Sequence, residues 1–109
     1  MDDTNPAEPG DCTDIDPPAD VLVRTLEIVN RKGLHARATA KLVQCIDRFD
    51  VAVTVSRCGE TVGGTSIMGI LTLGAGPGMT ITVAATGAEA QKALDAIEAL
   101  VADRFGEDE

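Results

Sequence analysis

Apolar and polar residues alternate in four short segments of this chain, the pattern of β-strands that bury one face. The first segment, Val23–Asn30, places Leu26 and Ile28 on one face. Residues 57–60 contain Gly59 and are expected to form a turn between two neighbouring strands. The other three strands are predicted around Val51, Val53 and Val55, over residues 60–63, and around Met79, Ile81 and Val83.

Three other segments carry apolar residues at helical spacing. One helix is predicted over residues 36–49, and a helix of two turns over Ser66–Leu73, ended by the glycine-rich residues 74–78. A last helix is expected to end near Arg104, and residues 86–89 before it have the form of a capping box. The inner faces of the two long helices are expected to carry Leu42, Val43, Ile46 and Phe49 in the first, and Ala90, Leu94, Ile97 and Val101 in the last.

The order of these elements is βαββαβα. Strands with one apolar face and helices with one apolar stripe bury both when the helices pack on one side of an antiparallel sheet. We therefore predict a two-layer α+β sandwich, formed by a single domain over residues 21–105. The length of the chain, 109 residues, leaves room for one such domain.

The negative charge of the chain is concentrated at its two ends. The sequence holds 18 acidic residues against nine Lys and Arg, a formal net charge of −9. Seven acids, no base and four of the five prolines fall within residues 1–20. Few large apolar groups accompany them, so we expect residues 1–20 to be a disordered acidic extension. Residues 106–109 are expected to form a second, short acidic tail.

Five of the nine bases lie between Arg31 and Arg48, around the only histidine, His35. Such a patch on an acidic protein favours an acidic or phosphorylated protein partner, although most charge runs are only solvated surface. Nucleic acid is a poorer candidate, because the acidic ends would repel phosphates and no aromatic residues line up for stacking on bases. The chain shows no secretory signal and no membrane-spanning run, so we expect a cytoplasmic monomer without membrane insertion.

The cysteines and the histidine offer no metal site. Cys12, Cys45 and Cys58 are odd in number and show no Cys-x-x-Cys spacing. We expect all three to be reduced, with Cys45 partly packed on the first helix. A lone histidine provides no cluster of metal ligands, so we expect no metal and no other cofactor.

Residues 33–37, Gly-Leu-His-Ala-Arg, place His35 in a turn that opens onto the first predicted helix. The free N–H groups and the positive dipole end of a helix N-terminus favour an anion there. Arg37 adds a planar guanidinium that suits phosphate, beside the first-turn backbone of Ala36, Arg37 and Ala38. An imidazole beside an anion site can carry a phosphoryl group. A histidine at a helix start is, however, more often a cap or a surface residue.

Two motifs make the chain similar to a known family. Residues 33–40 (GLHARATA) resemble the active-site signature of HPr, the histidine-containing phosphocarrier protein of the bacterial phosphotransferase system. Residues 65–74 (TSIMGILTLG) resemble that family's regulatory-serine segment at a similar separation, and the resemblance covers roughly residues 23–104. It implies an open-faced two-layer sandwich with strand order 1-4-2-3 and three helices on one face. It also implies phosphorylation at Nδ1 of His35. The commonest family pattern has proline where Ala38 stands, a change that we expect to leave a working site.

The second motif implies regulation and docking. Ser66 matches the family's kinase-modified serine, although serine is also a preferred N-cap residue. The apolar residues of a two-turn helix cannot all face a sheet, so part of this helix is expected to be exposed and suited to several partners. In the family this helix joins the first helix in the docking surface, which implies docking by Lys41, Gln44, Ile67, Met68 and Leu71.

The resemblance implies a phosphocarrier that accepts a phosphoryl group on His35 from phosphorylated enzyme I and passes it to enzyme IIA domains, with Arg37 as the phosphate stabiliser. Such a protein is a substrate of its partners more than a self-contained enzyme. An HPr kinase/phosphorylase is implied as a further partner through Ser66. Two alternatives stay open: a regulatory protein of the nitrogen-related system that signals by its phosphorylation state, and a non-catalytic interaction domain in which His35 is only a helix cap.

Overall fold

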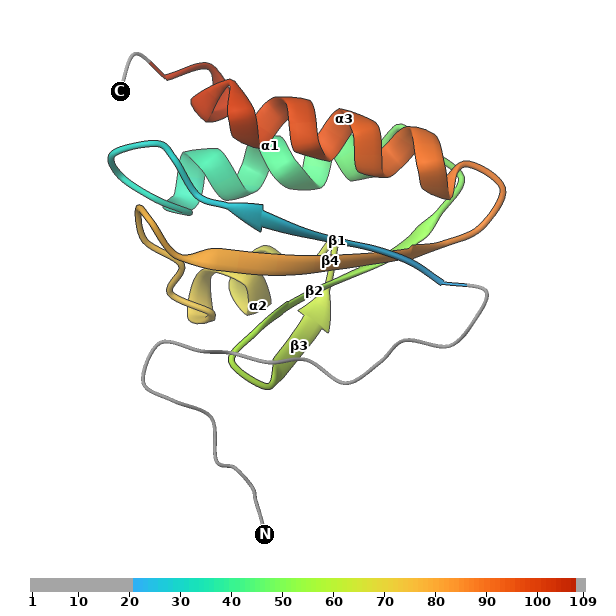
Figure 1. Ribbon diagram of the computed structural model, residues 1–109, viewed down its shortest axis with the longest axis horizontal. Coiled ribbons are helices and arrows are strands. Elements are labelled where there is room, and N and C mark those ends of the chain that lie inside the picture. Colours follow the sequence, from blue (N-terminus) through green and yellow to red (C-terminus); the bar gives the residue numbers. More distant parts are fainter. Residues whose placement is uncertain (1–20, 108–109) are drawn as a thin grey trace, which may run out of the picture.

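The predicted order βαββαβα is confirmed by the computed structural model, which describes residues 21–107 (Figure 1). One short 3₁₀ turn follows the last helix. The strands are β1 (Leu22–Glu27), β2 (Ala52–Arg57), β3 (Glu60–Gly63) and β4 (Thr80–Thr86), and the helices are α1 (Ala36–Asp47), α2 (Ile67–Thr72), α3 (Ala90–Ala102) and the 3₁₀ turn η1 (Arg104–Gly106).

The four strands form one sheet in the order β1-β4-β2-β3, with all neighbours antiparallel. This is the order that the family resemblance implied. Leu26 of β1 pairs with Ile81 of β4, and Val55 of β2 pairs with Val83 of β4. Because side chains alternate between the two faces of a strand, these pairs bring four buried apolar residues to the same side of the sheet.

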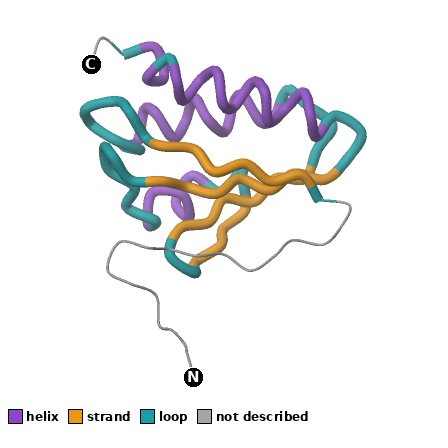
Figure 2. Tube along the Cα trace, in the orientation of Figure 1, coloured by secondary structure: helices purple, strands orange, loops and turns teal. Residues whose placement is uncertain are grey.

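The helices cover that apolar side. The long helices α1 and α3 run side by side, and α2 packs against α1 and β3 (Figures 1 and 2). The opposite side of the sheet is polar, and the hydroxyl oxygens of Thr25 and Thr82 lie 3.5 Å apart on it. The predicted two-layer α+β sandwich is therefore confirmed. The core between sheet and helices is mainly aliphatic, and Phe105 is its one fully buried aromatic residue among those described. The predicted inner-face residues Leu42, Val43, Ile46, Ala90, Leu94, Ile97 and Val101 are all buried.

The predicted capping box before α3 is wrong. Thr86 is the last residue of β4, where it pairs with Ala52. The N-cap of α3 is Glu89, and its carboxylate accepts a 2.7 Å hydrogen bond from the backbone N–H of Asp50 without capping the helix. Pairing within the sheet keeps Thr86 in the strand, and this tertiary interaction outweighs the local capping motif.

Three elements are shorter than predicted, one of them α2, which spans Ile67–Thr72 and is capped by Ser66 and Leu73. The first strand ends at Glu27 and not at Asn30, where its partner strand β4 also begins, and Ile28 beyond it donates to the carbonyl oxygen of Met79 at 2.8 Å. Helix α1 ends at Asp47, and Phe49 closes its last turn by donating to the carbonyl oxygen of Ile46 at 3.1 Å. Phe49 still packs against the core.

The cysteine prediction is wrong for Cys58, which is disulfide-bonded. Cys58 is exposed in the turn between β2 and β3 and has left-handed backbone, with φ +53. Cys45 is a free thiol buried on α1, as expected. Cys12 lies outside the described residues. An odd cysteine count and the lack of a Cys-x-x-Cys motif therefore did not exclude a disulfide.

The described residues contain no helix that is both long and apolar enough to cross a membrane. The predicted disordered extension, residues 1–20, lies outside the described part of the chain, as do residues 108 and 109 of the predicted tail.

Candidate functional site

The loop between β1 and α1 is held against the loop between α2 and β4. Ile28 donates to the carbonyl oxygen of Met79 at 2.8 Å, and Leu34 donates to that of Ala75 at 2.9 Å. Gly33 has φ +67, and a Cβ atom there would lie 2.7 Å from the carbonyl oxygen of Ala75. Only glycine allows the two loops to approach this closely in this conformation. Their contact fixes the point at which α1 begins.

His35 is the N-cap residue of α1, with extended backbone (φ −79, ψ −178). Its carbonyl oxygen accepts the first helical hydrogen bond, from the N–H of Thr39 at 2.9 Å. The amides of Ala36, Arg37 and Ala38 precede this bond and are the donors that the first turn presents to an anion. The imidazole itself makes no capping hydrogen bond. The alternative in which His35 is only a helix cap therefore finds no support.

The imidazole is directed toward the C-terminal segment instead. Nε2 of His35 lies 2.5 Å from Oε2 of Glu107, and Asn30 donates from Nδ2 to Oε1 of the same carboxylate at 3.0 Å. Side-chain exposure is 15% for Glu107 and 27% for His35, so the contact is partly shielded from water. The hydrogen bonds from Asn30, first, and from His35 lower the pKa of Glu107 from its ordinary value. Glu107 is therefore ionised at neutral pH.

Sequence reasoning missed both Asn30 and Glu107. Glu107 falls in the predicted acidic tail, yet Phe105 before it is fully buried and returns the chain to the core. One of only two aromatic residues, placed directly before the tail, was the signal that could have shown this. Asn30 falls at the end of a predicted strand. It is completely buried, and its Nδ2 donates to the carbonyl oxygen of Gly33 at 2.8 Å. No local sequence pattern predicts either feature.

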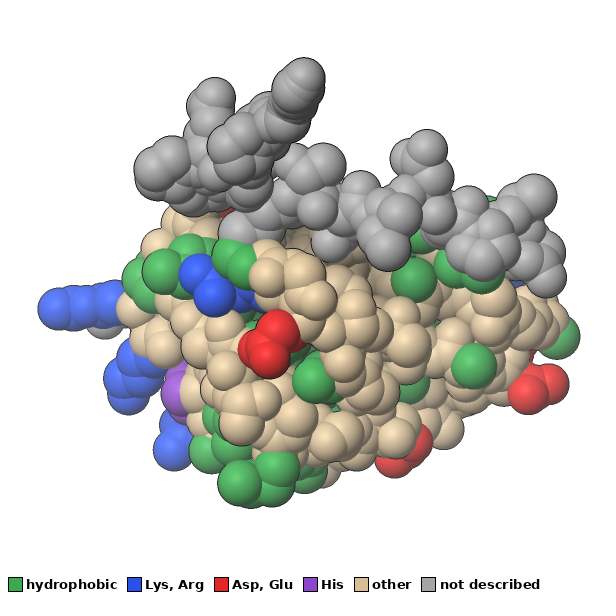
Figure 3. Space-filling model, turned by 90° about the horizontal axis from the view of Figure 1, so that it is seen from below, with side chains coloured by type: hydrophobic (Ala, Val, Ile, Leu, Met, Phe, Trp, Pro, Cys, Tyr) green, Lys and Arg blue, Asp and Glu red, His purple; other side chains and the backbone are tan. Residues whose placement is uncertain are grey.

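Cationic side chains surround this site. Arg37 is exposed on the first turn of α1, and Arg31 and Lys32 are exposed on the loop before it. Figure 3 shows Lys and Arg side chains gathered around the histidine at one end of the molecule. The N-terminus of α1 thus carries an imidazole, the N–H donors of a first helical turn and an exposed arginine, which are the groups needed to hold a phosphoryl group on a ring nitrogen.

Comparison with known proteins agrees with this geometry. Residues 22–103 match the family model described as PTS HPr component phosphorylation site, where PTS is the phosphotransferase system. The chain belongs to the HPr family. Phosphocarrier protein HPr of Cupriavidus necator is 48% identical over 89 residues, which cover 82% of this chain and 100% of that protein. Phosphocarrier protein NPr of Shewanella violacea is 42% identical over 86 residues, which cover 79% and 94% of the two chains.

Solved HPr structures share the fold. HPr-C-His from Thermoanaerobacter tengcongensis has a TM-score of 0.77 and 35% identity, over 81% of this chain and 99% of that one. HPr from Bacillus anthracis has a TM-score of 0.71 and 36% identity, over 74% and 96%. Fold and sequence together show that this HPr family member is a phosphocarrier of the phosphotransferase system.

The serine of the second HPr motif caps α2. Ser66 is the N-cap residue, and its Oγ accepts a 3.1 Å hydrogen bond from the N–H of Gly69. Ser66 is exposed, so its hydroxyl is accessible while it caps. Next to it, Ile67 is 41% exposed and Met68 is 72% exposed, whereas Leu71 is half-buried. The expectation that α2 exposes part of its apolar surface is confirmed.

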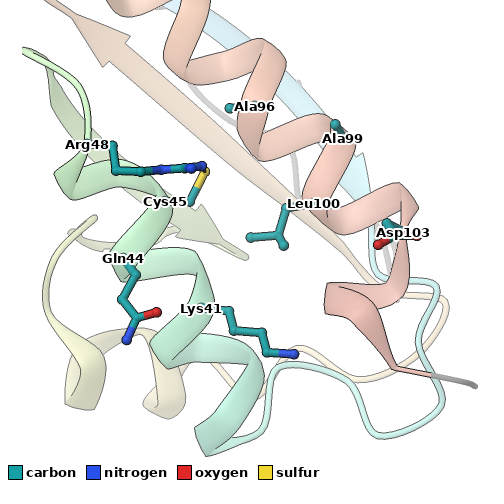
Figure 4. A pocket seen from close by; sticks show the side chains of 8 residues that line it. All are labelled: Lys41, Gln44, Cys45, Arg48, Ala96, Ala99, Leu100 and Asp103. Carbon is teal, nitrogen blue, oxygen red and sulfur yellow. The ribbon is translucent and has the colours of Figure 1, made fainter.

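Lys41 and Gln44 lie on the side of α1 that meets a groove between α1 and α3 (Figure 4). The groove has a volume of about 690 Å³. Lys41 is directed along it toward the C-terminal segment and donates from Nζ to the carbonyl oxygen of Phe105 at 2.6 Å. Gln44 is exposed and points away from α3. Lys41 therefore has a structural contact that the docking assignment did not foresee.

Proposed function

We propose that His35 is the phosphoryl acceptor of this phosphocarrier. The observation that carries the proposal is the orientation of the ring: an N-cap residue whose imidazole does not cap is placed beside the donors of the first turn. One ring nitrogen faces Glu107, and the other is left for a phosphoryl group. The neutral ring then acts as the nucleophile.

Arg37 and the first-turn amides stabilise the phosphoryl oxygens. Arg37 is exposed on the first turn of α1, two residues after His35, so its guanidinium is available to bind the oxygens of the phosphoryl group. The amides of Ala36, Arg37 and Ala38 supply donors that are already oriented. Ala38 stands where the family has proline, and it is completely buried, so the turn stays closed with alanine at this position.

The donor is phosphorylated enzyme I, and the acceptors are enzyme IIA domains. The docking surface combines the cationic loop and first turn with the apolar surface of α2, and we assign to it Lys41, Gln44, Ile67, Met68 and Leu71. Apolar residues of this kind adapt to several partners, and the cations steer acidic ones. A carrier must release each partner after transfer, which favours such a small mixed surface over a deep pocket.

Ser66 is a regulatory phosphorylation site for an HPr kinase/phosphorylase. A phosphate on Oγ would add about −1.5 to −2 charges at the N-terminus of α2, which tolerates negative charge. The same charge would lie beside Ile67 and Met68 and oppose the approach of an acidic donor. Phosphorylation would therefore weaken docking without unfolding the domain.

The phosphocarrier acts as a cytoplasmic monomer with an acidic extension, residues 1–20, before its domain. The domain extends past the predicted boundary at residue 105, because Gly106 belongs to η1 and Glu107 contacts His35. The disulfide at Cys58 is unusual for that compartment, where thiols are kept reduced. The redox state of Cys58 in the cytoplasm can be measured by counting free thiols on protein extracted under acid quench.

Transfer from enzyme I tests this function. The full chain is incubated with enzyme I, Mg²⁺ and phosphoenolpyruvate, and an enzyme IIA domain is then added. We expect the phosphoryl group to appear on the chain and then on the IIA domain, and both steps to fail with His35→Ala. Arg37→Lys should slow the first step, whereas Arg48→Lys, at the opposite end of α1, should not. Normal transfer to His35→Ala would overturn the proposal.

A further inference from the structure

The C-terminal segment is held in a strained conformation. Arg104 and Phe105 both have left-handed backbone, with φ +57 and φ +56. Left-handed backbone is unfavourable for residues with a side chain, and it persists only where the surroundings hold it. Phe105 is fully buried, and its carbonyl oxygen accepts the 2.6 Å hydrogen bond from Nζ of Lys41. These contacts turn the chain back toward α1 and place Glu107 next to His35.

Asn30 fixes the orientation of the Glu107 carboxylate. Its Nδ2 donates both to the carbonyl oxygen of Gly33 at 2.8 Å and to Oε1 of Glu107 at 3.0 Å. Both partners are acceptors, so the amide cannot turn round and offer its oxygen to them. Oδ1 of Asn30 is buried without a hydrogen-bond partner among the described residues, a cost that the structure bears to keep Nδ2 on this side.

We propose that Glu107, held by Asn30, is a positioning residue that keeps the ring proton of His35 on Nε2 and thereby presents the Nδ1 lone pair to the phosphoryl donor. The inference deepens the proposed function and rests on His35 as the acceptor. An ionised carboxylate only accepts hydrogen bonds, so the Nε2 that faces it must carry the proton. In a neutral imidazole the other nitrogen, Nδ1, then carries the lone pair.

The transfer step follows from this arrangement. The Nδ1 lone pair attacks phosphorus and forms a P–N bond, while the P–N bond to the donor's histidine breaks and its electron pair returns to the donor's ring. The Nε2 proton stays in place, so the phosphorylated ring becomes cationic beside the Glu107 carboxylate, which balances that charge. Onward transfer reverses these changes. Because Nδ1 and Nε2 lie on different sides of the ring, the carboxylate and the phosphoryl oxygens remain apart.

Two variants of Glu107 separate this role from a merely structural one. Glu107→Ala removes the acceptor, so both tautomers of the His35 ring become available. Glu107→Gln changes the side chain less, but it replaces the hydrogen-bond acceptor that faces Nε2 of His35 by a donor. Because Asn30 supplies N–H groups, the oxygen of the new amide faces Asn30, and its NH₂ group faces Nε2 of His35. A donor at that position places the ring proton on Nδ1, the nitrogen that must react.

The experiment is ¹⁵N NMR of the His35 ring in the full chain, at a pH where the ring is neutral, with the rate of phosphorylation by enzyme I. We expect the Nε2–H tautomer in wild type, a mixture in Glu107→Ala and mainly Nδ1–H in Glu107→Gln. Phosphorylation should be slowed in Glu107→Ala and slowed further in Glu107→Gln. The control Asp103→Asn, which removes one charge from the same part of the chain, should match wild type in both measurements.

The result that overturns the inference is a set of wild-type ring shifts in both Glu107 variants, or a Glu107→Gln variant that is phosphorylated as fast as wild type. Failure of the proposed function looks different, because His35→Ala would then still be phosphorylated. Asn30→Ala is an independent variant, since it leaves Glu107 present but no longer held. Asn30→Ala should lower the population of the Nε2–H tautomer of His35, as Glu107→Ala does.

Discussion

Nζ of Lys41 on α1 donates a 2.6 Å hydrogen bond to the carbonyl oxygen of Phe105, so the first helix holds the turn that leads to Glu107, the carboxylate in contact with His35. The bond joins residues 64 positions apart in the chain. Active-site histidine, helix and C-terminal segment are thus one unit. A substitution in this unit that does not touch His35 should therefore still change the position of Glu107.

Lys41→Met tests that link. The variant keeps the apolar stem of the side chain but loses the charged donor to the Phe105 carbonyl, so the left-handed turn loses one of its supports. We expect the free energy of unfolding to fall by about 1 kcal/mol, the low end for a hydrogen bond from a charged group because Lys41 is half-exposed. Amide hydrogen exchange at Glu107, whose N–H donates to the carbonyl oxygen of Arg104 at 2.9 Å, should become faster. Lys92→Met on the exposed face of α3 is the control, and equal effects of the two changes would contradict the link.

Gly33→Ala tests the close approach of the two loops. The substitution meets a left-handed φ and a backbone contact at 2.7 Å from the Ala75 carbonyl oxygen. Gly59 has φ +85, but no atom lies within 4 Å of the place that a Cβ would take there, so Gly59→Ala carries the cost of conformation alone. Denaturant unfolding should show a loss of about 1 kcal/mol for Gly59→Ala and a larger loss for Gly33→Ala. Phosphorylation by enzyme I should be slowed only by Gly33→Ala. Similar unfolding energies for the two variants would show that the loops can move apart at no cost.

Ser66 offers a test of regulation against capping. Ser66→Ala removes the oxygen that accepts from Gly69 and should cost about 1 kcal/mol of stability, with phosphorylation of His35 unchanged. Ser66→Asp keeps a capping oxygen and adds charge, so its melting temperature should stay near wild type while phosphorylation by enzyme I slows. Thr65→Asp places the same charge one residue earlier, away from the cap. If Ser66→Asp and authentic phosphoserine both leave the transfer rate unchanged, Ser66 is only a helix cap.

Acid should release the C-terminal segment. The pKa of Glu107 is lowered in the folded protein by its hydrogen bonds to Asn30 and His35. A carboxyl group of this kind stabilises the folded state above its ordinary pKa of 4.5, and the contribution is lost as the pH falls through the lower folded-state pKa. Unfolding measured from about pH 6 to about pH 3 should therefore show wild type and Glu107→Ala converging in acid. If the difference in unfolding free energy between them grows as the pH falls, folding raises the pKa of Glu107 and does not lower it.

The fold was largely predictable because its elements carry strong local patterns. The alternation in β2 and β4, the inner face of α3 and the glycine-bounded helix α2 each specify a structure without help from distant residues. The capping box at residues 86–89 misled because strand pairing of Thr86 outweighs a local signal. The disulfide at Cys58 was missed because exposure in a turn, not spacing, makes a thiol available.

The active site was predictable only in part. The motif around His35 predicted the start of α1, which the structure confirms, and it placed the proposed acceptor and Arg37 there, because all three are close in sequence. Glu107 comes from a position 72 residues away and Asn30 from the end of an apparent strand, so only the packing of Phe105 brings them together. A charged residue near a chain end looks like solvated tail until the residue before it is known to be buried.

The most direct test of the central claim is ³¹P and ¹⁵N NMR of the intact chain after phosphorylation by enzyme I. The ³¹P signal should couple to one ring nitrogen of His35, and that nitrogen should be Nδ1, while Nε2 keeps its proton. The signal should disappear when an enzyme IIA domain is added. A phosphoryl group attached to any residue other than His35, or a ring of His35 without phosphorus coupling, would contradict the account.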